Sequence, residues 1–164
     1  MAKFTVGKGA EEYVKLLEGL EKETQHIIGK AVYDGAKIVT DAIHAGIAGI
    51  PVHVDSKVGS DSDPVAGLTA AQRQGLLEGL GIAKMQNRSG YLHVKVGVDG
   101  YNRTKTKKYP NGQPNALIMR SIESGTSFRA KHPVVAPAVA RTRKSAEKAM
   151  ADRIDSEVNK KMKG

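Results

Sequence analysis

The sequence predicts an α+β fold with a long helix at each end of the chain and a small sheet between them. Apolar residues recur every three or four positions from Gly9 toward Gly46, and again after Pro137, which is the period of a helix with one buried face. Between these stretches, residues 91–98 alternate apolar and polar side chains, as a half-buried strand does. We therefore expect a long N-terminal helix, a short second helix and a long C-terminal helix packed on a small, mostly antiparallel sheet.

The length of 164 residues predicts one α+β domain spanning 1–164. Aromatic residues make up only 4% of the chain, so the core must be built mainly from aliphatic side chains. Cysteine is absent, which excludes disulfides and thiolate chemistry. We expect flexible tails at 1–8 and 160–164, and loops at 59–66 and 99–115, where glycine, proline and polar residues gather.

The first helix is too long for a compact domain of this size. About 35 residues at 1.5 Å each span roughly 50 Å, whereas the expected radius of gyration is only about 15 Å. The helix must therefore extend beyond the core, break at Gly29 or Gly35, or lie against a partner. This excess length is a first indication of oligomerisation.

Two shorter elements are predicted between the long helices. Thr69 is a plausible N-cap for a second helix from Ala70 to about Leu80, which Gly79 and Gly81 would end. Residues 91–98, Tyr-Leu-His-Val-Lys-Val-Gly-Val, predict a single strand.

The segment 116–139 predicts a fixed corner between two ordered pieces of chain. An apolar-periodic stretch ends at Glu123, and Gly125 permits a backbone turn that is closed to other residues. Pro133 and Pro137 then restrict the exit angle, and Pro137 is predicted to be the first residue of the last helix.

The sequence predicts no catalytic, cofactor-binding or metal site, and we expect the protein not to be an enzyme. The five histidines are scattered, without the spacing of a metal site. Glu123 is expected to end a helix or to pair with Arg120, Arg129 or Lys131, and Thr126 to support a turn. No nucleophile, base and oxyanion site come together in this pattern.

The formal net charge is +9, which favours an acidic or polyanionic partner. Part of this excess lies in the predicted loop, at Arg103, Lys105, Lys107 and Lys108. Tyrosines flank these cations, so the loop could bind nucleic acid through charge and stacking. The alternative is a solvated, mobile loop.

The corner also resembles a known family. Glu123-Ser124-Gly125-Thr126, followed by His-Pro-Val-Val-Ala-Pro-Ala at 132–138, is similar to the tail-completion or neck proteins of long-tailed bacteriophages. That family typically has Glu-aromatic-Gly-Thr and then Pro-Phe-x-x-Pro-Ala, so Ser124 and Val134 stand here where it usually has aromatic residues. The positions that match its motif are Glu123, Gly125, Thr126, Pro133, Pro137 and Ala138.

The resemblance implies a non-enzymatic structural virion protein that forms a ring, commonly six-fold, at the joint between head and tail. Its partners would be further copies of itself and neighbouring head–tail connector and tail proteins, with the passing DNA as a further candidate. It would reside in the virion neck or tail after assembly in the host bacterial cytoplasm, and no membrane segment is expected. A tail terminator or other head–tail connector, and a small basic nucleic-acid-binding protein, remain the alternatives.

Overall fold

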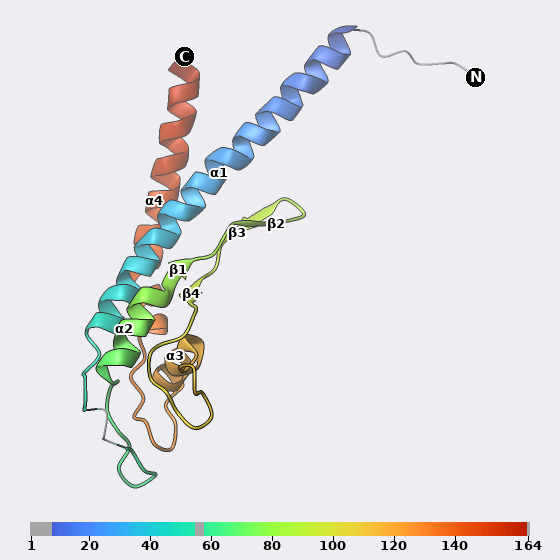
Figure 1. Cartoon of the computed structure of the whole chain (residues 1–164). Helices are drawn as coiled ribbons and strands as arrows, with labels where there is room; N and C mark the ends of the chain where they lie inside the picture. Colours follow the sequence, from blue (N-terminus) through green and yellow to red (C-terminus); the bar gives the residue numbers. More distant parts are fainter. Residues whose placement is uncertain (1–7, 55–57, 164) are drawn as a thin grey trace.

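Two long antiparallel helices form the frame of the molecule, and the other elements lie beside the middle and the C-terminal part of the first of them (Figure 1). In the computed structural model, which describes residues 8–54 and 58–163, the helices are α1 (Lys8–Ala48), α2 (Ala70–Gly79), α3 (Asn115–Ser124) and α4 (Val135–Lys163). The strands are β1 (Leu80–Ile82), β2 (Gln86–Arg88), β3 (Tyr91–His93) and β4 (Val96–Val98). The predicted α+β fold is confirmed, and α4 continues through most of the segment expected as a C-terminal tail.

The first helix, α1, runs without a break for 41 residues, or about 60 Å. Gly29 and Gly35 do not interrupt it, and instead give room to side chains from other elements. A Cβ atom at Gly35 would lie 2.8 Å from the sulfur of Met150 in α4, and one at Gly29 would lie 3.3 Å from the sulfur of Met85. The helix therefore accommodates its excess length by extending past the other elements, as Figure 1 shows.

The second helix begins at the predicted cap. The Thr69 hydroxyl accepts a hydrogen bond from the Gln72 N–H (3.2 Å), and the Gln72 side chain accepts one from the Thr69 N–H (3.2 Å). This reciprocal capping box satisfies two N–H groups that a helix leaves free at its start. α2 ends at Gly79, and β1 follows directly.

The prediction of a single strand over residues 91–98 is wrong. This segment forms two strands, β3 and β4, which belong to separate two-stranded antiparallel ladders: β4 pairs with β1, and β3 pairs with β2. Between the two ladders, the Ala83 N–H donates to the Lys95 carbonyl (2.8 Å). In the same stretch, the Met85 N–H donates to the Tyr33 hydroxyl of α1 (3.0 Å).

The apolar core lies where the C-terminal part of α1 meets α2, α3 and the start of α4. Its fully buried large side chains are Ile47, Ile50, Leu68, Leu76 and Ile122. All of them are aliphatic, as the low aromatic content requires. In the part of the chain that the structure describes, no helix combines the length and the apolarity needed to cross a bilayer.

Candidate functional site

The predicted corner is formed by the end of α3 and the start of α4. Gly125 follows α3 with a φ of +75°, a conformation that residues with a Cβ rarely adopt, and its N–H donates to the Ser121 carbonyl (3.0 Å). Thr126 and Arg129 then exchange backbone hydrogen bonds of 2.9 and 3.3 Å. The glycine therefore ends the helix, and a tight turn that starts at Thr126 reverses the chain.

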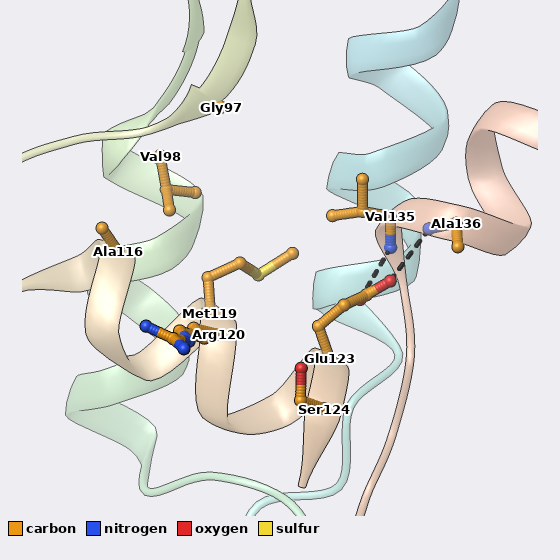
Figure 2. A pocket seen from close by; sticks show the side chains of 9 residues that line it. All are labelled: Gly97, Val98, Ala116, Met119, Arg120, Glu123, Ser124, Val135 and Ala136. Carbon is orange, nitrogen blue, oxygen red and sulfur yellow. Dashed lines mark hydrogen bonds between the residues drawn. The ribbon is translucent and has the colours of Figure 1, made fainter.

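Glu123 joins the two helices through its carboxylate. Its oxygens accept hydrogen bonds from the N–H groups of Val134 (2.8 Å), Val135 (3.0 Å) and Ala136 (3.0 Å); Figure 2 shows the bonds to Val135 and Ala136. The first N–H groups of a helix have no partner within the helix, and a negative charge there is favoured by the helix dipole. Glu123 is thus the N-terminal cap of α4, supplied from another helix.

This cap explains the position of Pro137. The first backbone bond within α4 runs from the Ala138 N–H to the Val134 carbonyl (3.1 Å), so Pro137 is the third helical residue and the prediction that it is the first is wrong. Proline has no N–H, and three other N–H groups of this turn bind Glu123. Carboxylate and proline together leave no N–H of this turn without a partner.

The surroundings of Glu123 also set its ionisation. Burial by itself would raise the pKa of this carboxyl, but the N–H groups of Ala136, Val134 and Val135, with the charge of Lys131, lower it below its usual value. The prediction of a pair with Arg120, Arg129 or Lys131 is therefore correct only in that Lys131 contributes its field. The carboxylate itself binds backbone.

The remaining motif residues complete the same structural unit. The His132 N–H donates to the Ile122 carbonyl (2.9 Å), which places Pro133 on the surface just before α4. Val134 is buried, and a Cβ atom at Gly46 of α1 would lie 2.5 Å from one of its methyl groups. Ala138 is 2% exposed and belongs to the core. The structure therefore brings Val134 and Ala138 together against α1.

Sequence reasoning missed the position of Arg129. This side chain is 9% exposed, and its guanidinium donates to the Gly67 carbonyl (2.6 Å) and to the Gln72 side chain (3.2 Å). Burial lowers its pKa. It ties the turn after α3 to the start of α2, and nothing local distinguishes it from the many exposed arginines of the chain.

An apolar groove of about 450 Å³ lies beside the corner, between β4, α3 and the first turn of α4 (Figure 2). Its lining is mainly aliphatic, with the ionisable side chains of Arg120 and Glu123 included: Gly97, Val98, Ala116, Met119, Arg120, Glu123, Ser124, Val135 and Ala136. Leu117 and Val139, which belong to the same two helices, are 42% and 44% exposed. Exposed apolar surface, to which both helices contribute, is a common feature of protein interfaces.

The second predicted site, the basic loop, is separate from the corner. Arg103, Lys105, Lys107 and Lys108 are all exposed, and within the described residues no hydrogen bond or ion pair connects them to the corner motif. The described residues also contain no group of three or more metal-ligating side chains. The structure thus presents two candidate binding surfaces, the groove and the loop.

No protein-family model matches this chain, and neither the curated proteins nor the solved structures contain a significant match.

Proposed function

We propose that this protein is a structural subunit of a tailed-phage neck, a tail-completion protein that assembles with copies of itself into a ring at the head–tail joint. The resemblance at Glu123-Ser124-Gly125-Thr126 and at residues 132–138 suggests the class of protein. The geometry that supports it best is the shape of α1, which extends well past the elements that pack against its C-terminal part (Figure 1).

A helix of this kind favours assembly. Every described side chain from Glu21 to His26 is exposed, and an isolated helical segment gains most of its stability from packing against other elements. A neighbouring subunit would contact this segment through polar and charged side chains, since residues 21–26 are Glu-Lys-Glu-Thr-Gln-His. A chain that folded only for itself would have little use for about 60 Å of helix.

A closed ring is built from heterologous contacts, in which two different surfaces of one subunit meet. One of these surfaces would be the apolar groove beside Glu123. The other would be the extended part of α1, whose exposed side chains at 21–26 are polar or charged. The cap on α4 fixes the angle between α3 and α4, and so the shape of the groove.

The proposal is tested by removing the gene from a phage that encodes this protein and examining the particles by electron microscopy. We expect filled heads and separate tails that fail to join, because the neck layer is missing. Normal infectious particles from the deletion would contradict the proposal.

Complementing the gene deletion with variants of the protein identifies the surface that takes part in head–tail joining. Ala136→Arg places a long charged side chain at the groove, on an exposed residue, and should leave head–tail joining defective. Ala151→Arg, on an exposed position of the same helix outside the groove, is the matched control and should restore joining. If Ala136→Arg restores joining as well as the control does, the groove is not the interface.

A further inference from the structure

The basic loop between β4 and α3 is anchored at both ends. Tyr101 and Pro114 form an antiparallel bridge, and the Asn102 N–H donates to the Gln113 carbonyl (2.9 Å). The Asn102 side chain is 3% exposed, and its amide donates to the same carbonyl (3.0 Å). The loop therefore leaves the body of the protein and returns to it at a fixed stem.

The tip of the loop is also ordered by backbone hydrogen bonds. Thr106 and Tyr109 exchange two of them, of 3.1 and 3.0 Å, so that Lys107 and Lys108 are the two residues at the turn. The Lys108 ammonium lies 5.6 Å from the centre of the Tyr109 ring, within the range of a cation–π contact. The two lysines at the tip are held outward.

Exposed and half-buried residues alternate along the arm that leads to the tip. Thr104 and Thr106 are half-buried, whereas Arg103, Lys105 and Lys107 are exposed. The Thr104 N–H donates to the Asn102 side chain (2.9 Å), which holds the start of the arm. Together with Lys108 at the turn, the loop therefore exposes four cations within six consecutive residues.

None of these cations forms an ion pair in the part of the chain that the structure describes, although Glu78 of α2 and Arg103 line one pocket. The ion pairs found there lie on α1 and α4. Asp99 is the one acidic residue between Val98 and Asn115, and its carboxylate accepts a hydrogen bond from the Gly100 N–H (2.7 Å). Four exposed cations without ion pairs on one anchored loop favour an anion that carries repeated charges.

We propose that this loop binds the phosphodiester backbone of nucleic acid, without reading base sequence. Rows of lysine and arginine bind nucleic acid by neutralising phosphates and releasing counterions, and the loop offers four such side chains on a preformed frame. Because the stem and tip are already ordered, little conformational entropy is lost on binding. The inference does not depend on the neck proposal, since it concerns the isolated subunit.

The test measures binding of the full chain to a fluorescent DNA duplex and to the corresponding single strand, by anisotropy across a range of salt concentrations. If four phosphates are neutralised, the logarithm of the binding constant falls with the logarithm of salt with a slope of about −3.6 for duplex. That slope weakens binding roughly 100-fold between 50 and 200 mM salt. Replacing all four cations with glutamine (R103Q/K105Q/K107Q/K108Q) should remove the part of the salt dependence that these four cations contribute.

The matched control removes four exposed cations elsewhere, in K37Q/K84Q/R141Q/K144Q. Both variants lower the formal net charge of +9 by four, so only the position of the charge differs. Circular dichroism confirms that each variant is folded, and K107Q/K108Q, which alters only the turn, replaces the loop variant if that one does not fold. We expect the loop variant to lose binding and the control to keep most of it.

Three results would overturn the inference. One is the absence of binding to either DNA at about 50 mM salt, where such contacts are strong. Another is an equal loss of DNA binding in the loop variant and in the control, which would show that binding depends on the overall charge of the protein. The third is equal competition by polyglutamate at matched charge, which would show that the loop recognises acidic proteins. If binding is seen, the ratio of the two DNA affinities identifies the form that is bound.

Discussion

The two ends of the α1–α4 pair are held together by different kinds of contact. At the core end, Val134 packs so closely on Gly46 that a Cβ there would lie 2.5 Å from a methyl group, and Ile47 is fully buried. These contacts are apolar and exclude water. They do not depend on salt or pH.

At the far end, the helices are joined by charged side chains. Lys30 of α1 pairs with Glu157 of α4 (3.1 Å), and Asp34 pairs with Arg153 (2.5 Å). Beyond these pairs the helix ends diverge (Figure 1). These pairs are partly buried and form a network, because Arg153 and Lys160 also contact Glu157 (3.5 and 3.3 Å). They still lie near the surface, so salt screens them more than it affects the apolar contacts of the core end.

The comparison indicates that the core end of the α1–α4 pair is rigid and that its far end is adjustable. The core end and the Glu123 cap set the direction of α4, while the far ends can change their separation at little energetic cost. A subunit that must meet several neighbours would use this combination. The following predictions test the contrast, from the largest expected effect to the smallest.

The same substitution at the two ends of α1 should have opposite consequences. Gly46→Ala gains helix propensity of about 1 kcal/mol, but its Cβ meets the buried Val134 side chain, and such overpacking destabilises by about 1–3 kcal/mol. Gly19→Ala places its Cβ in open space, so only the gain remains. We expect Gly46→Ala to be less stable than Gly19→Ala by about 1–3 kcal/mol in denaturant unfolding, and equal stabilities would contradict the close packing.

Removing the charge of Glu123 should destabilise the first turn of α4. Glu123→Gln keeps the shape but loses the charge and one acceptor, and we expect a loss of about 1–2 kcal/mol, as for other N-caps. The pKa of Glu123 is lowered by folding, so its contribution is present above the usual carboxyl value and is lost as pH falls through the folded value. The difference between wild type and Glu123→Gln should therefore shrink at acidic pH. A difference that does not change with pH would show that the charge is unimportant.

Removing the charge of Glu157 should separate the far ends of the helices with little effect on folding. The hydrogen bond from Lys30 is the largest of the contributions that lower the pKa of Glu157 to about 2, so the native pairs persist until the pH falls toward that value. In Glu157→Gln, spin labels at the exposed positions 21 and 159 should report a longer and broader distance distribution, as should high salt in the wild type.

Glu147→Gln is the control for this measurement, because Glu147 pairs with Arg143 within α4 (3.0 Å) and does not connect the two helices. It should leave the distance distribution unchanged. An equal change in both variants would show that the ion pairs between α1 and α4 do not hold the far ends together.

Local chemistry made part of the fold predictable. Thr69 caps α2 because its partner, Gln72, is three residues away. The two long helices follow from the spacing of apolar residues every three or four positions, which can be seen in any short stretch of either helix. Apolar and polar side chains alternate without interruption over residues 91–98, and this pattern predicts a single strand. Where the ladders are interrupted, Met85 contacts Tyr33 and Gly29 of α1, more than 50 residues away from the strand.

The sequence by itself determined that this protein is α+β, with two long helices, an aliphatic core and a turn at Gly125, because helix period, capping and glycine geometry act over a few residues. Only the tertiary structure decided that Glu123 caps α4, that Arg129 is buried, and that the loop carrying Lys107 and Lys108 is anchored. Each of these depends on groups that are brought together when distant or separately ordered segments pack. Which donor meets which acceptor across such a distance is decided by packing, and packing cannot be read from residue type and spacing alone.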